Sequence, residues 1–320
     1  MSCAPTSRPS NEGACSQGVE AESARFRQVA LLTLARARGE DLQHALIRFA
    51  IERWLYRLSV SRHADWFVLK GAILFAAWED APQRPTLDLD LLGYGDNRPP
   101  SLVEVFREVA REAVPDDGLV FEPDSVRGEE IREEGVYPGV RLRLRAHLGK
   151  AVIPVQIDVG FGDPVTPGPV DLEYPSLLGH ASPKLRGYPP ETVIAEKFES
   201  MISLGMKNTR MKDFYDLWHI AKARGFEGKV LQQAVASTFK ARGTPLPAQP
   251  PTAFTPEFSL DEAKQKTWAA FLARSRLQAP TSLHEVVLDL EEFLLPLAMD
   301  TERFRRIWPP GGPWQGREET

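Results

Sequence analysis

Two neighbouring segments of the chain alternate apolar and polar residues with a period of two, and a β-sheet with one buried face satisfies that pattern. In residues 139–146 Val and Leu alternate with three arginines, and residues 152–159 repeat the alternation before Gly160. A turn near residues 147–150 would pair the two strands as a hairpin. The chain therefore contains a sheet with one apolar face and one polar face.

Segments in which apolar residues have helical spacing precede and follow these strands in the chain. Before them, two amphipathic stripes are separated by Gly39, a candidate helix stop. After them, residues 191–204, 211–224 and 283–295 each carry one apolar face. The order predicts an α+β fold, in which a small mixed-sheet core is flanked by N-terminal helices and a C-terminal helical region.

The boundaries follow from the points where the pattern changes. Ser, Gly and Pro in the first residues predict a disordered tail, and Pro296 is expected to end the last helix. The expected parts are a tail at 1–20, N-terminal helices at 21–60, an α/β core at 61–185, a helical region at 186–300 with a Pro-rich loop at 243–257, and a frayed tail at 301–320.

Composition narrows the class of protein. The 320 residues are 42% hydrophobic and 26% charged, which is ordinary for a soluble globular chain. The formal charge of −5 means that a nucleic acid would have to meet a local basic patch. Cys3 and Cys15 form neither a disulfide framework nor a zinc motif. With no signal peptide and no long apolar run, we expect a cytoplasmic protein without a membrane partner.

The sharpest local motif is the alternation Leu-Asp-Leu-Asp-Leu at residues 87–91. On a strand, Asp88 and Asp90 share one face and the leucines share the other. Two close carboxylates repel each other unless a cation lies between them or one is protonated. Mg²⁺ is the natural cation, because it takes carboxylate oxygens together with substrate phosphates. The alternative is the solvated face of an edge strand.

Two further features strengthen the interpretation as a metal site. Lys70 and Gly71 stand where a short apolar strand meets a helix, and the small residue would let a phosphate approach the backbone. Asp158 is a third carboxylate, on a later strand. If that strand lies beside the first, the three carboxylates converge and could hold two metal ions. Taken singly, Gly71 could merely form a turn and Asp158 a solvated strand end.

Another charged cluster falls on the C-terminal helices. Lys197 lies on an amphipathic helix, and Asp213 and Asp216 are three residues apart on the next, so they share a helix face. Arg210 and Lys212 could meet a triphosphate. Surface ion pairs would produce the same pattern.

Together these residues resemble the AbiEii/AbiGii-type nucleotidyltransferase toxins of the polymerase-β-like nucleotidyltransferase superfamily. The resemblance covers roughly residues 40–225 and consists of four blocks in the family's order. They are the Lys70–Gly71–Ala72 turn, the strand from Arg84 through Thr86 to Asp88 and Asp90, the lone Asp158, and Glu196–Lys197 followed by Lys212-Asp213-Phe214-Tyr215-Asp216-Leu217. Many relatives have Gly-Gly where this chain has Gly71-Ala72. Residues 226–320 match no known motif.

The resemblance implies an enzyme that moves a nucleoside monophosphate from an NTP to an acceptor. Asp88, Asp90 and Asp158 would bind two Mg²⁺ ions, and Asp158 could instead activate the acceptor hydroxyl. Asp213 would orient Lys197, touch the nucleotide, or be structural. The triphosphate would be lined by Lys70, Gly71, Arg84 and Thr86, with charge on pyrophosphate neutralised by Lys197 and by Arg210 or Lys212.

The family also implies partners. Relatives with an assigned target act on tRNA ends, so the expected acceptor is RNA, and the expected antitoxin is of the winged-helix type. The arginines at 141, 143 and 145 form either a backbone-contacting stripe or a solvated strand face. Competing interpretations are transfer to a protein or small molecule, a non-catalytic nucleotide- or antitoxin-binding module, and a helical structural protein.

Overall fold

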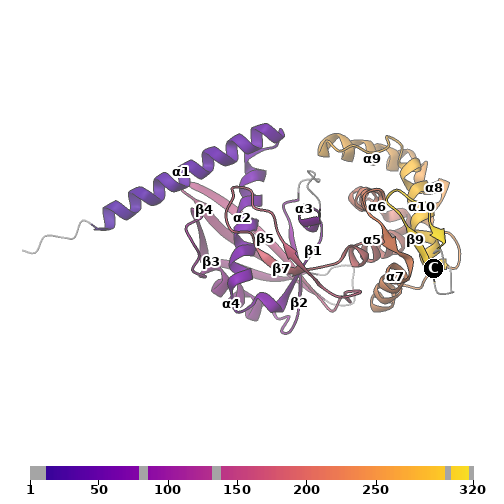
Figure 1. Cartoon of the computed structure of the whole chain (residues 1–320), viewed down its shortest axis with the longest axis horizontal. Coiled ribbons are helices and arrows are strands. Elements are labelled where there is room, and N and C mark those ends of the chain that lie inside the picture. The colour runs from indigo at the N-terminus through magenta and orange to yellow at the C-terminus, as the bar shows by residue number, and fades with distance from the viewer. Residues whose placement is uncertain (1–11, 79–85, 132–137, 300–303, 317–320) are drawn as a thin grey trace, which may run out of the picture.

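A mixed seven-stranded sheet forms the centre of the N-terminal half of the protein (Figure 1). The computed structural model describes residues 12–78, 86–131, 138–299 and 304–316. The strand order is β3-β4-β5-β2-β1-β7-β6. The strands are β1 Phe67–Lys70, β2 Leu89–Gly93, β3 Leu119–Ile131, β4 Gly139–Leu148, β5 Ala151–Phe161, β6 Val170–Glu173 and β7 Lys184–Gly187.

The expected hairpin is present as β4 and β5, which pair antiparallel across the turn at Gly149 and Lys150. β2 then lies parallel to β5 and antiparallel to β1, and β1 lies parallel to β7. On β4 and β5 the apolar residues are buried and the alternate residues are polar or more exposed. The α+β expectation of a mixed sheet flanked by helices is confirmed.

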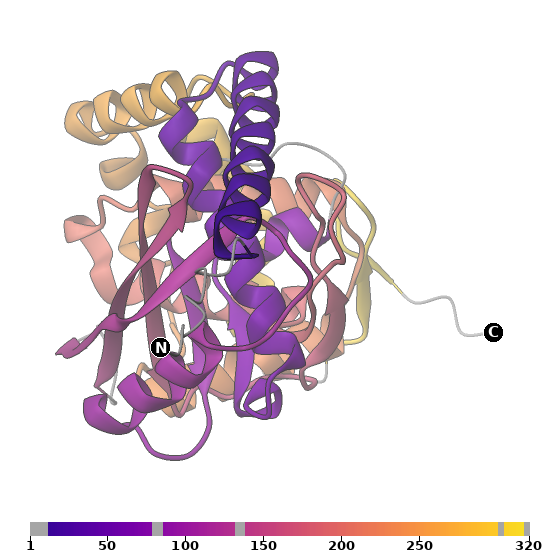
Figure 2. The ribbon, with the colours of Figure 1, turned by 90° about the vertical axis from the view of Figure 1, so that its left-hand side faces the viewer.

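Helices precede and follow the strands of this sheet in the chain. In the N-terminal half, α2 packs against β5 and β7, and α4 packs against β3. Figure 2 shows α1 in front and the C-terminal helices behind. The helices are α1 Glu12–Arg38, α2 Leu42–Val60, α3 Leu74–Trp78, α4 Pro99–Ala110, α5 Pro190–Leu204, α6 Met211–Ala223, α7 Gly228–Arg242, α8 Pro256–Ser259, α9 Glu262–Ser275 and α10 Leu283–Met299. Within the described residues, none of them is long and apolar enough to cross a bilayer.

Three boundaries differ from the expectation. α1 begins at Glu12, inside the segment expected as a tail, and no proline interrupts it from there to Arg38. The sheet extends through β7 to Gly187, two residues beyond the expected core. The loop expected at 243–257 contains short helical turns in which Phe254 is buried.

The C-terminal end was also predicted wrongly. Pro296 lies inside α10, in its last turns, where a missing N–H removes one backbone bond while the neighbouring side chains stay buried. Residues 306–316, expected as part of a frayed tail, contain β9 (Arg306–Trp308) and β10 (Gln315–Gly316). β9 pairs antiparallel with β8 (Phe226–Glu227) on one side and with β10 on the other. Trp308 and Trp314 pack against Phe293, and their indole nitrogens donate to backbone carbonyls.

A buried ion-pair cluster fastens α2 to the segment that enters β3. Asp117 accepts hydrogen bonds from Arg53 Nε at 3.0 Å and from Arg57 Nη1 at 2.6 Å, and all three side chains are almost fully buried. Burial alone would raise the pKa of Asp117, but the arginines outweigh burial and hold the pKa below its usual value. The folded state therefore depends on Asp117 being ionised.

We expect Asp117→Asn to lower the free energy of unfolding by about 3–5 kcal/mol at neutral pH, because the buried Arg57 loses its counter-ion and the buried Arg53 keeps only Glu52, at 3.4 Å. Urea unfolding measures the loss. The matched control is Asp124→Asn, whose side chain is 91% exposed and which should change stability by less than about 0.5 kcal/mol. Equal unfolding midpoints for the two variants would contradict the prediction.

The ionisation of Asp117 also makes the stability of the protein depend on pH. A carboxyl group whose pKa is lowered on folding stabilises the protein above its unfolded pKa of about 4, and this contribution disappears as pH falls through the folded pKa. The stability difference between wild type and Asp117→Asn should therefore shrink below about pH 4.

Candidate active site

The pairing of five strands aligns five charged side chains in one row across the polar face of the sheet. The parallel β2–β5 register places Asp90 beside Asp158, and β1 places Lys70 beside Asp90. On the other side β4 places Arg141 beside Asp158, and β3 places Glu129 beside Arg141. Neighbouring strands are about 4.8 Å apart, so each of these residues lies next to the one on the adjoining strand. The expected meeting of Asp90 with Asp158 is present.

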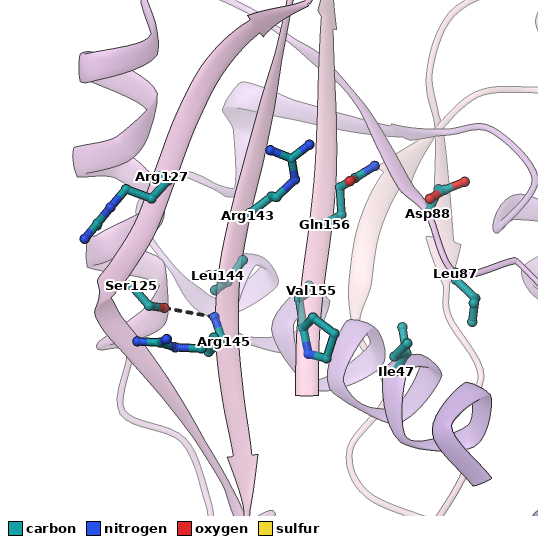
Figure 3. A pocket seen from close by; sticks show the side chains of 11 residues that line it. Ile47, Leu87, Asp88, Ser125, Arg127, Arg143, Leu144, Arg145, Val155 and Gln156 are labelled. Carbon is teal, nitrogen blue, oxygen red and sulfur yellow. Dashed lines mark hydrogen bonds between the residues drawn. The ribbon is translucent and has the colours of Figure 1, made fainter. Parts of the chain in front are cut away.

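Asp88 directly precedes β2, one step outside this row. Leu89 and Leu91 are buried on the opposite face, as the alternation predicted. The neighbour of Asp88 on β5 is Gln156, and both line the same pocket (Figure 3). Asp88 is exposed while Asp90 is half-buried, so the pair runs from solvent into the protein.

Asp158 forms an ion pair with Arg141 that was not expected from the sequence. Arg141 Nε and Nη2 donate to its two carboxylate oxygens at 2.8 and 2.7 Å. This bond raises the pKa of Arg141 above its usual value, so the pair is firmly ionic. Three converging carboxylates were expected, and the structure pairs one of them, Asp158, with the guanidinium of Arg141. Arg141 therefore belongs to the site and is not free to form part of an RNA-binding stripe.

The turn after β1 packs directly against Asp90. Gly71 has φ +78°, and a Cβ at this position would lie 2.1 Å from Asp90 Oδ2. Glycine is required there both by its backbone conformation and by the carboxylate. The preceding Lys70 is nearly buried, and its Nζ donates to Asp163 Oδ2 at 3.1 Å. The predicted Lys70–Gly71 turn and the predicted carboxylate are thus in contact.

The helical residues form a second group. Lys197 on α5 donates to Asp213 Oδ1 at 2.6 Å and lies 2.9 Å from Asp216 Oδ2 on α6. Arg210, at the start of α6, places its Nε 2.6 Å from Asp213 Oδ2. Asp213 is fully buried, so this is an internal ion-pair cluster and not a set of surface helix pairs.

The remaining predicted residues divide as follows. Thr86 lies two residues before Asp88 and its hydroxyl points to the backbone carbonyl of Asp88 at 3.4 Å. Lys212 is exposed on α6. Arg84 lies outside the described residues.

Two residues that the sequence analysis did not identify connect the sheet with the helices. Asp163, just after β5, binds Lys70 and lies 3.5 Å from Arg242 Nη2 on α7. Arg242 also lies 3.4 Å from Glu196 and 2.9 Å from Glu199 on α5. Burial alone would raise the pKa of Asp163, but Lys70 and Arg242 outweigh it and hold the pKa below its usual value. No motif marked either residue, because their partners are distant in sequence.

The residues fit a hard divalent cation only in part. Asp88 and Asp90 supply carboxylate oxygens in adjacent positions, which suits Mg²⁺. In the part of the chain that the structure describes, no group of three or more His, Cys, Asp or Glu side chains is arranged to hold a metal ion. Asp158 is kept out of such a group by Arg141.

Comparisons with known proteins bear on the same residues. The family model "Nucleotidyl transferase AbiEii toxin, Type IV TA system" matches residues 53–296. None of the curated proteins compared with the chain matches it significantly.

Two solved structures from Helicobacter pylori are similar to the chain. JHP933 is 15% identical with a TM-score of 0.42, covering 81% of this chain and 91% of its own. A putative nucleotidyltransferase is 16% identical with a TM-score of 0.43, covering 81% of this chain and 94% of its own. The family match spans most of the chain, including the carboxylate strand, Asp158 and the Lys197–Asp213 cluster, and the chain therefore belongs to the AbiEii nucleotidyltransferase toxin family of type IV toxin–antitoxin systems.

Proposed function

We propose that this nucleotidyltransferase moves a nucleoside monophosphate from an NTP to the end of an RNA, such as a tRNA, and thereby acts as a toxin in the cytoplasm. The observation that carries the proposal is the contact between Asp90 and the Gly71 turn, next to Asp88. A strand–helix turn that exposes backbone N–H groups can bind phosphates, and carboxylates beside it can hold the cation that phosphates require.

Asp88 and Asp90 are the residues that would hold Mg²⁺, which when bound would neutralise phosphate charge and orient the NTP. Because both oxygens of Asp158 bind Arg141, we propose one ion and not two, with Asp158 as a positioning residue that fixes Arg141. Lys70 and Thr86 would line the triphosphate. Arg84, Arg210 and Lys212 are proposed as further triphosphate contacts.

We propose that Lys197 neutralises the charge that develops on pyrophosphate as it leaves. Asp213 then acts as a positioning residue, because it lies within 2.6 Å of both Lys197 and Arg210 and is fully buried. Its carboxylate would hold the two cations in one orientation. The antitoxin partner that the family implies is proposed to be a winged-helix protein.

The function is tested by incubating the protein with each radiolabelled NTP, Mg²⁺ and cell lysate. We expect label in RNA from wild type and a loss of at least about 100-fold in Asp88→Ala, because removing a metal-holding carboxylate removes charge stabilisation at the reacting phosphate. Asp171→Ala, an exposed residue on β6, is the matched control and should retain full activity. Label found only in protein or a small molecule would overturn the RNA acceptor, and no label anywhere would overturn the enzyme.

Gly71→Ala should reduce transfer as strongly as loss of a carboxylate, because its Cβ would displace Asp90 Oδ2 and strain the φ +78° turn. The control is Gly95→Ala, which has φ +102° but no atom within 4 Å of the added Cβ. Rates of NMP transfer and circular dichroism separate loss of activity from loss of fold. A folded, fully active Gly71→Ala variant would remove the turn from the site.

Asp213→Asn should reduce kcat by about tenfold with a smaller effect on the KM for NTP, because Lys197 and Arg210 lose the charge that orients them for the leaving group. Asp216→Asn, also buried and paired with Lys197, provides the comparison and should reduce kcat less. Equal loss in both variants, in proportion to their loss of thermal stability, would make Asp213 purely structural.

A further inference from the structure

A pocket of about 550 Å³ opens on the polar face of the sheet beside Asp88 (Figure 3). In the strand order it lies on the β5 side of β2, opposite to β1, which carries Lys70. Its walls come from α2, from the segment before β2, and from β3, β4 and β5. The volume is that of a site for one nucleotide-sized group. The lining residues are Ile47, Leu87, Asp88, Ser125, Arg127, Arg143, Leu144, Arg145, Pro154, Val155 and Gln156.

One row of side chains leads across this pocket to Asp88. Arg127 on β3 is in register with Arg143 on β4, and Arg143 is in register with Gln156 on β5. Gln156 in turn lies beside Asp88, one step before the Leu89–Ile157 pair. With about 4.8 Å between strands, the backbone of Arg143 lies roughly 10 Å, and that of Arg127 roughly 14 Å, from the backbone of Asp88. Figure 3 shows the four side chains in that order.

These two arginines differ in their partners from the others on this face. Arg127 Nη1 donates to the backbone carbonyls of Asp124 and Val126, and no carboxylate among the described residues forms an ion pair with it. Arg143 pairs with Glu129, but both side chains are more than half exposed, so a phosphate can replace the glutamate at little cost. Arg145 is held by two bonds to Glu122, and Arg141 by two to Asp158.

Apolar residues form the other side of the pocket. Ile47 and Leu87 lie below the row of polar side chains in Figure 3, and Pro154 also lines the pocket. Such a surface suits the face of a base, which is apolar and planar, while the amide of Gln156 can hydrogen-bond to a base edge or a sugar hydroxyl.

We propose that this pocket binds the acceptor, and that the acceptor is a single-stranded RNA end. Arg127 and Arg143 bind successive phosphates, Ile47, Leu87 and Pro154 receive the terminal base, and the terminal hydroxyl lies beside Asp88. The assignment rests on the proposed function, whose NTP occupies the Lys70–Gly71 side of the same carboxylates. A side chain of a protein acceptor would give the two arginines no phosphate to bind.

Binding is tested with the full chain and a short 5′-labelled single-stranded oligoribonucleotide, followed by fluorescence anisotropy at several salt concentrations. We expect the double variant Arg127→Gln/Arg143→Gln to bind about tenfold more weakly at low salt. The slope of log K against log salt should fall by about 1.4, or about 0.7 for each lost phosphate contact. Arg62→Gln, an arginine 75% exposed and paired with Glu108 on α4, is the control and should bind as wild type does.

A gain-of-function variant excludes misfolding as the explanation. Glu129→Gln removes the carboxylate that competes for Arg143 and should tighten oligoribonucleotide binding by severalfold. Glu262→Gln on α9 is the matched control for the same change of charge, since its side chain is 83% exposed and pairs only with Lys266 among the described residues. No binding by wild type, or no difference between the Glu129 and Glu262 variants, would overturn the pocket assignment.

Label transfer separates this proposal from the function on which it rests. If wild type labels RNA and the double arginine variant labels it with unchanged KM for RNA, the pocket assignment is wrong and the enzyme stands. If label enters a phosphorylated small molecule whose KM rises in the variant, the arginines bind phosphate but the RNA acceptor is wrong. If label enters protein alone, both proposals fall.

Discussion

The site depends on the position of β2 between two strands of different orientation. Its parallel pairing with β5 brings Asp90 beside Asp158, and its antiparallel pairing with β1 brings Asp90 beside Lys70 and the Gly71 turn. A shift of one residue in either register would turn Asp88 and Asp90 into the core and expose Leu89. The buried leucines Leu89 and Leu91 therefore fix the orientation of the carboxylates by the hydrophobic effect.

Charge compensation explains why this row is stable before any substrate binds. The row consists, in order, of Glu129, Arg141, Asp158, Asp90 and Lys70. Neighbouring residues in the row carry opposite charges, except for Asp158 and Asp90. The uncompensated step is between Asp158 and Asp90, and it lies where the proposed cation would act. Arg141 reduces the repulsion there by binding Asp158, and Asp88 and Asp90 are the carboxylates proposed to hold the metal.

Much of this arrangement is local in the sequence and could be predicted from it. The Leu-Asp alternation fixed the faces of β2, the arginine alternation predicted the β4–β5 hairpin, and the helical spacing predicted α5 and α6 with Lys197 and Asp213. What could not be predicted depends on strand order. Nothing in the pattern shows that Arg141 would lie opposite Asp158, or that Asp163 would meet Arg242 from α7. The C-terminal strands were missed because Trp308 and Trp314 pack against Phe293, on a helix distant in the pattern that the sequence shows.

The sheet and the helices are joined through the site itself. Asp163 pairs with Lys70 on the sheet and with Arg242 on α7, and Arg242 binds the same helix α5 that carries Lys197. These side chains are mostly buried, so their ion pairs are little screened by solvent and hold a defined geometry. Lys70, proposed to contact the triphosphate, is therefore linked through Asp163 and Arg242 to the helix of Lys197, which is proposed to meet pyrophosphate. The position of Lys197 relative to the carboxylates is thus set by packing and buried charge, which is what transfer chemistry based on fixed electrostatics requires.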